Sequence, residues 1–454
     1  MGFRRNLVIR FAKWASNMSQ KIRGGQGVTL PGYIARKLDH NILTSLNNDV
    51  RKKTFVVLGT NGKTTTNSIL YNALAAEGEK VIINKTGSNM MNGVTSAYVL
   101  ATDKKGRLDA DYACIEVDEL ASLTVLPEIR PDYLILTNIY RDQLDRFGEV
   151  DITFQKLKEA IRKTPNTVLL INGDDVLSYT LAKESGNEFH VYGINEQIFD
   201  DTSRSEIRES IFCRQCGHKL EYKFFHYGQL GDYSCPNCGL TRPVAEYSAS
   251  QIQLSDSGST FTVGDRSFTT GAKAPYNIYN TMAAYAALRM AGLEASHFEQ
   301  MIAAYDYGNS RESQFDIAGT HLQIHLAKNP VGFQQKVSFV LRDDKPKDII
   351  ILINDEAQDG KDVSWLWDVD FQYLANANAN SIIAAGKRGY DMQLRLKYED
   401  IPCEVTQNLK ETICDCIDHR SDNLYVIVNY TGLYSTNALL ENLAKEYAGK
   451  EGQS

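Results

Sequence analysis

The sequence lacks the features that would place the chain in a membrane, outside the cell or along a nucleic acid. Its 454 residues contain no apolar run that approaches the roughly 18 to 20 residues of a membrane-spanning helix. Basic residues are in deficit, with a net charge of -7, whereas binding along a nucleic-acid backbone requires dense Lys and Arg. The start of the chain is too charged for a secretory signal. We therefore expect a cytoplasmic protein whose thiols are reduced.

The composition is otherwise that of an ordinary globular protein. Hydrophobic residues make up 43% of the chain and charged residues 23%, which supplies enough apolar surface for packed cores. Ten prolines and 32 glycines leave no room for a long low-complexity region. The length predicts two to four domains.

Four of the eight cysteines form two Cys-x-x-Cys pairs. Cys213 and Cys216 lie in CRQC, Cys235 and Cys238 lie in CPNC, and a glycine directly follows each pair. A thiolate pair on a tight turn, repeated once, supplies the four soft ligands of a tetrahedral zinc ion. We predict a zinc ribbon, inserted at about residues 205–245; a redox pair or two unrelated pairs are the alternatives. Few basic residues surround the cysteines, so nucleic-acid binding is the less expected use.

A phosphate-binding loop is predicted between a strand and a helix near residue 60. The segment TFVVLGTNGKTTTNSILYNAL (54–74) has an apolar strand at 55–58 and helical periodicity from Thr64. Backbone N–H groups of such a turn, together with a helix N-terminus, bind an anion. Lys63 would reach the terminal phosphates, and Thr64 would offer its hydroxyl to magnesium. The loop is a shortened GxxGKT, and its predicted ATP-binding residues are Gly59, Thr60, Asn61, Gly62, Lys63, Thr64 and Thr65; a chance Gly-Lys-Thr turn is the alternative.

Strands and helices alternate beyond this loop, as in a doubly wound, mostly parallel sheet. Apolar strands are expected within 112–119, 131–137 and 167–172, and polar residues follow each of them. Ligands of such sheets lie beyond the carboxyl ends of the strands. Glu116 is therefore predicted to bind magnesium, directly or through water. Asp142 and Asp145 could equally bind metal or cap a helix.

A smaller α/β domain is expected after about residue 315. The predicted strands are HLQIHLA, KVSFVLR, DIIILIN, SIIAAG and NLYVIVN, and residues 386–397 are expected to form a turn and a helix. Asp355 follows DIIILIN, where a functional carboxylate and a strand-end cap are equally compatible with the pattern. The expected limits are 1–48 for an N-terminal helical segment, 49–314 for the ATP-binding domain with its insertion, and 315–454 for the C-terminal domain.

The N-terminal segment has an amphipathic pattern. Apolar residues recur at helical spacing at Phe3, Leu7, Phe11 and Trp14, and the basic residues Arg4, Arg5, Arg10 and Lys13 lie among them. Such a helix can lie in a membrane interface or pack on the protein with its basic residues in solvent. The sequence favours the packed helix.

These motifs together resemble the central ATPase domain of the Mur ligase superfamily, which includes folylpolyglutamate synthetase. The segments that carry the resemblance are GTNGKTTT, EVDE, TNIYRDQLDRFG, YNIYN (276–280) and GNSRES (308–313). Members of the superfamily activate a carboxylate as an acyl phosphate, which an amine then attacks. The four-Cys insertion, LAKNPVGFQQ (326–335) and NDEAQDGKDVSWLWD (354–368) narrow the resemblance to the MurT family, the ligase subunits of lipid II isoglutaminyl synthase.

The narrower resemblance implies a reaction and a partner. A MurT-like chain would use ATP and magnesium to amidate the α-carboxylate of D-glutamate in the lipid II stem peptide, giving D-isoglutamine. Its ammonia would come from glutamine through a GatD-like glutaminase subunit, with which it forms a heterodimer. Asp355 matches the aspartate that is thought to complete the Cys–His pair of that partner into a triad. The lipid-anchored substrate implies a location at the inner face of the membrane.

Motif matching also assigns the nucleotide-binding residues. Lys63, Thr64 and Glu116 match the phosphate and magnesium positions of the superfamily. Asn277 and Asn280 match its Asn-x-x-Asn near the nucleotide, and Arg311 matches the arginine that precedes its third domain.

The chain departs from the superfamily at three histidines. It has Asp142-Gln143-Leu144-Asp145 where relatives read Asp-His-Leu-Asp, Tyr276-Asn277 where they read His-Asn, and Lys328-Asn329-Pro330 where they read His-Asn-Pro. Loss of the first of these histidines, where this chain has Gln143, removes one possible metal or water contact and leaves the number of bound magnesium ions open. The counterpart of the carbamylated lysine of the relatives is also open, since Lys156 and Lys158 are both near the right distance.

Two other functions are compatible with the motifs. One is a free-standing ATP-dependent amide ligase of the Mur and folylpolyglutamate synthetase superfamily, and the other is a zinc-ribbon ATPase that serves as an assembly or nucleic-acid-binding platform. Only about 50 residues precede the phosphate strand, too few for the UDP-binding domain of a Mur ligase. That short segment, the four-Cys insertion and the missing histidine favour the amidotransferase subunit, and the acidic balance disfavours the platform.

Overall fold

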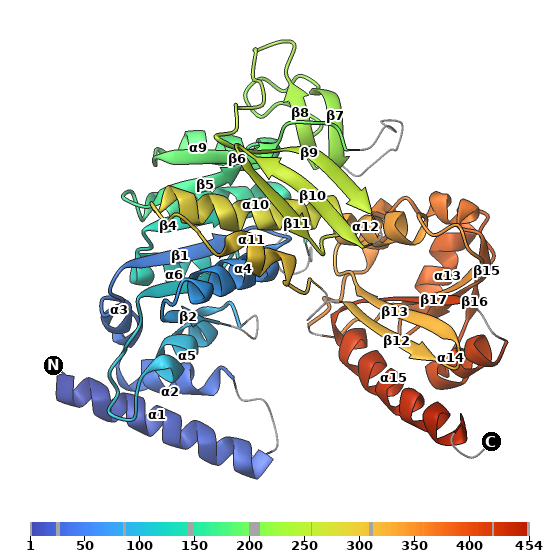
Figure 1. The fold of residues 1–454 in the computed structure, drawn as a ribbon, viewed down its shortest axis with the longest axis horizontal. Coiled ribbons are helices and arrows are strands. Elements are labelled where there is room, and N and C mark those ends of the chain that lie inside the picture. The colour runs from blue at the N-terminus through green and yellow to red at the C-terminus, as the bar shows by residue number, and fades with distance from the viewer. Residues whose placement is uncertain are drawn as a thin grey trace. The chain divides into compact units, whose positions relative to one another are not determined.

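The chain folds into two compact units. The computed structural model describes residues 2–23, 28–84, 88–142, 149–198, 209–255, 257–307, 312–356, 358–419 and 422–451. Unit 1 comprises Met1–Tyr140, Val150–Thr202 and Ser210–Tyr307, and unit 2 comprises Arg141–Glu149, Ser203–Glu209 and Gly308–Ser454 (Figure 1). The three-part division expected from the sequence stays a prediction.

Unit 1 is built on one large sheet. Its described strands follow the order β11-β10-β9-β6-β5-β4-β1-β3-β2. Along this order, neighbouring strands pair parallel from β2 as far as β9. At the opposite edge, β10 pairs antiparallel with both β9 and β11. The strands are β1 (Lys53–Leu58), β2 (Val81–Ile83), β3 (Tyr112–Glu116), β4 (Tyr133–Leu136), β5 (Val168–Asn172), β6 (Phe189–Ile194), β9 (Tyr247–Ser255), β10 (Gly258–Val263) and β11 (Arg266–Thr270). The central strand β1 is buried from Thr54 to Leu58, as expected for a parallel strand covered on both faces.

Helices cover both faces of this sheet. They are α1 (Gly2–Arg23), α2 (Leu30–Leu38), α3 (Ile42–Asn47), α4 (Lys63–Ala76), α5 (Met91–Ala101), α6 (Ser122–Ile129), α8 (Val150–Arg162), α9 (Val176–Ser185), α10 (Pro275–Met290) and α11 (Phe298–Ala303). Helix α10 is apolar or small on nearly all sides and is buried along most of its length, which is the pattern of a central helix. It packs beside α4 (Figure 1), the helix that follows the predicted phosphate loop.

A two-stranded hairpin lies between β6 and β9 in the sequence of unit 1. It consists of β7 (Glu221–Tyr227) and β8 (Leu230–Ser234), which pair antiparallel. The Cys213–Cys216 turn precedes β7, and the Cys235–Cys238 turn follows β8. At the far end of the hairpin, Tyr227, Gln229 and Leu230 are buried, so its tip is inserted into unit 1.

Unit 2 contains a smaller sheet with a hydrophobic core on each face. Its described strands follow the order β12-β13-β17-β14-β15-β16, and all pairs except β12–β13 are parallel. The strands are β12 (Glu312–Ile317), β13 (Thr320–Leu326), β14 (Lys347–Leu352), β15 (Ala379–Ala385), β16 (Glu404–Val405) and β17 (Asn423–Val428). The helices are α12 (Pro330–Val340), η1 (Ser364–Asp368), η2 (Phe371–Asn376), α13 (Gly389–Lys397), α14 (Leu409–Asp418) and α15 (Tyr430–Glu451).

The expected fold class is confirmed, but the strand predicted at KVSFVLR is wrong. Those residues belong to α12 and the turn after it. The Asn329 side chain caps this helix by accepting a hydrogen bond from the Gly332 N–H at 2.8 Å, and Pro330 occupies its first turn. The buried residues Phe333, Val337 and Val340 follow helical spacing. The cap and the spacing outweigh the β-propensity of the valines.

None of the helices in the described ranges combines the length and the apolar character that crossing a membrane requires.

Candidate functional site

The loop after β1 adopts a conformation that depends on its two glycines. Gly59 has φ +120° and Gly62 has φ +85°, in a region that other residues rarely adopt. Space is restricted as well. A Cβ on Gly59 would lie 2.3 Å from Thr137 Oγ1, and one on Gly62 would lie 2.2 Å from Asn280 Oδ1. Both glycines are therefore required for backbone geometry and for close packing.

Thr137 and Asn138, which follow β4, form hydrogen bonds with this loop. The Thr60 N–H donates to Asn138 O and the Asn61 N–H donates to Asn138 Oδ1, both at 2.9 Å. The Thr137 hydroxyl donates to Asn61 O at 2.7 Å. These contacts orient the loop at the carboxyl edge of the sheet, where α/β proteins bind their ligands.

Two carboxylates face the start of α4. The Lys63 ammonium lies 2.8 Å from Glu119 Oε1 and donates to Gly59 O at 2.5 Å, and the side chains of Lys63 and Glu119 are 7% and 4% exposed. The Thr64 hydroxyl donates to Glu116 Oε2 at 2.8 Å. Asn89 Nδ2 donates to the other oxygen of that carboxylate at 3.1 Å.

These oxygen atoms are the hard donors that a Mg²⁺ ion prefers. Thr64 and Glu116, predicted from the sequence, are in hydrogen-bond contact and fit this chemistry. Glu119 was not predicted, although it ends the same EVDE segment that pointed to Glu116. Its signal was present, but its pairing with Lys63 depends on the turn after β3.

Helix α10 brings the two predicted asparagines to the phosphate loop. Asn280 Oδ1 accepts a hydrogen bond from the Thr66 hydroxyl at 3.3 Å, and Asn280 Nδ2 donates to Asn277 Oδ1 at 3.3 Å. Both asparagines are buried. The structure thus gathers the predicted residues 59–65, 277 and 280 in one place, whereas Arg311 lies outside the described residues.

The tip of the β7–β8 hairpin contacts residues that adjoin the predicted phosphate loop. Gln229 Nε2 donates to Ile139 O at 2.7 Å and to Asp175 Oδ1 at 2.9 Å. Burial raises the pKa of the Asp175 carboxyl. The Tyr140 N–H donates to Thr60 Oγ1 at 2.9 Å. Residues 139 and 140 therefore connect the hairpin tip to the phosphate loop.

A series of buried hydrogen bonds connects the insertion to α10. Arg242 Nε donates to Asp174 Oδ1 at 2.6 Å, and the Tyr279 hydroxyl donates to Asp174 Oδ2. His226 Nδ1 lies 2.7 Å from the Tyr279 oxygen. Burial lowers the pKa of His226 and raises that of Tyr279. Tyr279 lies between Asn277 and Asn280, so these hydrogen bonds also fix the position of α10.

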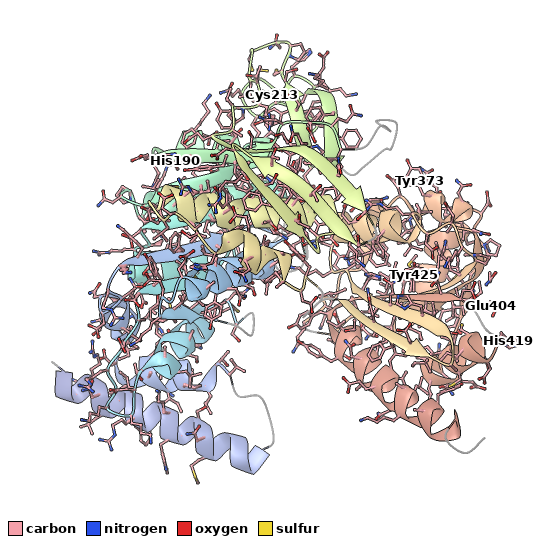
Figure 2. All side chains as sticks on the ribbon, viewed as in Figure 1. His190, Cys213, Tyr373, Glu404, His419 and Tyr425 are labelled. Atoms are coloured by element: carbon pink, nitrogen blue, oxygen red, sulfur yellow. The ribbon has the colours of Figure 1, made fainter. Side chains whose placement is uncertain are left out.

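The four cysteines of the two turns converge at the outer end of the insertion, where Figure 2 labels Cys213. Their sulfur atoms all lie within 4.8 Å of one another. Gly217 and Gly239 have φ +72° and +73°. Each turn also contains a hydrogen bond from the N–H of its first cysteine to the carbonyl oxygen five residues later, at 2.7 Å in both turns. Four convergent thiols fit a tetrahedral metal site with bonds of about 2.3 Å, so the cluster could hold a metal ion.

In unit 2, Asp355 lies just beyond the carboxyl end of β14. Arg388 places Nε and Nη2 each 2.9 Å from Asp355 Oδ2. The Asp355 side chain is 24% exposed, and no described residue donates a hydrogen bond to Oδ1. The carboxylate is therefore oriented through Oδ2, and its side chain is partly accessible.

Also in unit 2, Lys328 Nζ lies 2.5 Å from Asp142 Oδ2, and the Asp142 side chain is 6% exposed. Asp142 is thus held by a cation. Gln143, Leu144 and Asp145 lie outside the described residues.

Comparison with known proteins identifies the family. Residues 57–241 match the Mur ligase middle domain, and residues 326–433 match the MurT ligase C-terminal domain. The chain is 34% identical over 448 residues to the lipid II isoglutaminyl synthase (glutamine-hydrolyzing) subunit MurT of Staphylococcus aureus (strain COL), covering 98% of this chain and 99% of that protein. The chain belongs to the MurT family.

Solved structures support the same fold. A pseudomurein peptide ligase type C from Methanothermus fervidus superposes with a TM-score of 0.65 at 19% identity, covering 88% of this chain and 80% of that one. The MurF ligase of Thermotoga maritima, solved in complex with ADP, gives a TM-score of 0.60 at 13% identity over 92% of this chain and 85% of that one. The MurT-family chain thus has the Mur ligase fold that the sequence motifs predicted.

Proposed function

We propose that this chain is the ATP-dependent ligase subunit of a glutamine-hydrolysing lipid II isoglutaminyl synthase. The observation that carries the proposal is the full-length match to a MurT subunit of that enzyme, together with a phosphate loop whose lysine, threonine and two acidic residues converge. The substrate carboxylate is the α-carboxylate of D-glutamate in the lipid II stem peptide, and the product is its amide.

The phosphate loop activates that carboxylate. A carboxylate oxygen is a poor leaving group, so it first receives the γ-phosphoryl group of ATP and becomes an acyl phosphate. Residues 59–65 form the proposed phosphate site, in which the backbone N–H groups at the start of α4 orient the phosphates and Lys63 neutralises their developing charge. Thr64 and Glu116 would hold magnesium, which supplies further charge neutralisation when bound. Asn277, Asn280 and Arg311 complete the proposed ATP site.

Ammonia then completes the reaction. Its nitrogen attacks the acyl carbon, phosphate leaves, and one proton is released. We propose that the ammonia comes from a GatD-like glutaminase subunit in a heterodimer. Asp355 is the proposed residue that orients the catalytic histidine of that partner. Its partly exposed side chain and its Arg388 contact support this role, because a histidine is oriented by a fixed carboxylate that it can reach.

The four-Cys cluster has a structural role in this proposal. Zinc is the ion expected from four thiolates, with Cys213, Cys216, Cys235 and Cys238 as its ligands. The hairpin tip is buried beside Ile139 and Asp175. This burial favours a role in stabilising the ATP site over a role in binding nucleic acid. The protein would act in the cytoplasm at the inner face of the membrane, because the lipid II that it modifies is anchored there.

Mass spectrometry of lipid II tests the proposal directly. Lipid II is incubated with ATP, magnesium and glutamine, with this chain alone and with its co-purified glutaminase subunit. We expect exchange of one hydroxyl for an amino group per stem peptide only when both subunits are present, and with the chain alone when ammonia replaces glutamine. ATP hydrolysis without any change in lipid II would refute the proposed substrate. Glutamine-driven amidation by the chain alone would refute the proposed partner.

A further inference from the structure

Helix α1 carries a row of exposed apolar side chains on one face. Leu7, Phe11, Trp14 and Met18 follow at intervals of four, three and four residues, which places them on one side of a helix. They are 50%, 50%, 58% and 42% exposed, and the rings of Phe11 and Trp14 lie 5.7 Å apart. A contiguous apolar row, unlike scattered apolar residues, marks an interaction surface. We call these four residues the α1 stripe.

The opposite face of α1 is fixed to unit 1. Val8, Ile9 and Ala12 are buried in the core of that unit. Lys13 donates to the carbonyl oxygens of Leu100 and Thr102, while Arg5 and Asp49 form an ion pair at 2.8 Å. Figure 1 shows α1 along the outer edge of its unit, next to α2. The helix is therefore anchored with the stripe turned outward.

The charge of α1 points to the kind of surface that it contacts. The helix contains six basic residues and no acidic one, in a chain whose net charge is -7. Arg5 and Lys13 are used for anchoring, whereas Arg4 and Arg10 are exposed. On a helical wheel Arg4 lies beside Phe11 and Arg10 lies beside Trp14, so the two arginines border the stripe on opposite sides. Apolar residues bordered by cations match an anionic lipid interface.

We propose that the α1 stripe docks on an anionic phospholipid membrane. The four apolar side chains enter the interface, and Arg4 and Arg10 contact lipid phosphates. A second copy of the chain is a poorer occupant, because two such helices would bring two basic rows together. The consequence for catalysis rests on the proposed function: docking would bring the ATP site to a lipid-anchored substrate. The docking itself does not depend on that function.

Vesicle flotation of the full chain tests the docking. The vesicles contain phosphatidylglycerol and phosphatidylcholine, or phosphatidylcholine alone. We expect binding to the anionic vesicles, weakened by high salt. Phe11→Ala/Trp14→Ala should lower the partition coefficient at least about tenfold, since two large apolar side chains are removed. Arg4→Gln/Arg10→Gln should lower it by about tenfold on anionic vesicles only.

Matched controls separate the stripe from general stickiness. Tyr390 and Leu394 on α13 are 66% and 49% exposed and have the same four-residue spacing as Leu7 and Phe11, so Tyr390→Ala/Leu394→Ala should float like the wild type. Unchanged flotation of Phe11→Ala/Trp14→Ala, or no flotation of the wild type, overturns the proposal. Self-association that the stripe variant abolishes, without flotation, assigns the stripe to a second copy and also overturns it. Loss of flotation when the glutaminase subunit is added assigns the stripe to that partner and likewise overturns the membrane docking.

The link to catalysis is tested separately with the two-subunit enzyme. We expect Phe11→Ala/Trp14→Ala to lower kcat/KM about tenfold for lipid II in anionic vesicles, and to leave it unchanged for a water-soluble analogue that lacks the lipid. If neither substrate is amidated by the wild type, the proposed function fails, while flotation still decides the docking. Equal loss on both substrates would overturn the link to catalysis.

Discussion

Replacement of Gln229 tests whether the β7–β8 hairpin supports the proposed ATP site. Gln229 is fully buried at the hairpin tip and donates to Ile139 O and to Asp175 Oδ1. Leucine has a similar size but no donor. Gln229→Leu should therefore leave the hairpin folded, because its strands and cysteine turns are untouched, and weaken the contact between its tip and residues 138–140.

The expected cost follows from the two lost hydrogen bonds. A buried carbonyl left without its donor costs about 1–3 kcal/mol. Asp175 loses less, since it still accepts hydrogen bonds from the Ile139 and Leu177 N–H groups and the Ser178 hydroxyl. The sum is about 2–4 kcal/mol, which lowers the melting temperature of unit 1 by roughly 3–7 °C. If about 1.4 kcal/mol of this acts on the loop conformation that binds phosphate, the Kd for ATP rises about tenfold.

Calorimetry of ATP binding and thermal melting measure these two effects. Gln253→Leu is the matched control, because Gln253 is exposed on β9 of the same unit; it should change neither value. Wild-type melting and wild-type ATP affinity in Gln229→Leu would refute the coupling. A lower melting temperature with unchanged ATP affinity would show that the hairpin stabilises the unit without supporting the loop.

A second substitution at this position adds a pH dependence. Gln229→Glu places a new carboxyl next to Asp175, whose pKa burial already raises. Burial raises the folded-state pKa of the new carboxyl as well, so its protonated form is favoured in the folded protein. A carboxyl with a raised folded pKa is best tolerated below its unfolded pKa, and stability falls as pH rises through the folded value. Gln229→Glu should therefore be closer to wild type in denaturant melts at pH 5 than at pH 8, and an unchanged difference would contradict this reasoning.

The remaining predictions concern the charged residues and the metal site. Lys63→Ala should abolish amidation with ammonia as donor, measured as ADP release with lipid II, while far-ultraviolet circular dichroism stays unchanged. Glu119→Gln leaves the Lys63 ammonium buried without its counter-charge and should destabilise the protein without nucleotide by about 3–5 kcal/mol; ATP should raise its melting temperature more than that of the wild type. Asp355→Asn should impair the glutamine-dependent reaction of the two-subunit enzyme and spare the ammonia-dependent one, and intact glutaminase activity would disprove the triad role. Cys213→Ser/Cys238→Ser should lower the zinc content measured by mass spectrometry and weaken ATP binding as Gln229→Leu does.

Much of the fold could be predicted because its signals are local. β1, the phosphate loop and α4 are consecutive in sequence, and apolar runs marked β3, β4 and β5. KVSFVLR misled because its valines and phenylalanine suit a strand as well as a buried helix. The Asn329 cap and Pro330 lie several residues before that run, so the signals that start the helix fall outside the segment that suits a strand.

The clustering of the candidate site residues could be predicted only where they lie within short motifs. Gly59, Gly62, Lys63 and Thr64 belong to one segment, and the superfamily resemblance supplied Asn277 and Asn280. The supporting contacts could not be found in this way. Gln229 and Asp175 are 54 residues apart, and Tyr279 and Asp174 are 105 residues apart. Such pairs depend on tertiary packing, which residue spacing does not reveal.

The contact between Lys328 and Asp142 bears on whether Asp142 can bind a metal ion. The superfamily pattern has a histidine at position 328, and this chain has a lysine whose ammonium is 2.5 Å from the Asp142 carboxylate. A carboxylate that an ammonium group already neutralises has little charge left to attract a cation. A neutral histidine would leave that charge available. The lysine therefore argues against Asp142 as a magnesium ligand, whereas Thr64 and Glu116 remain the proposed ligands. Lys328→His should then raise the affinity of the protein for magnesium, measured by calorimetric titration, and an unchanged affinity would contradict this reasoning.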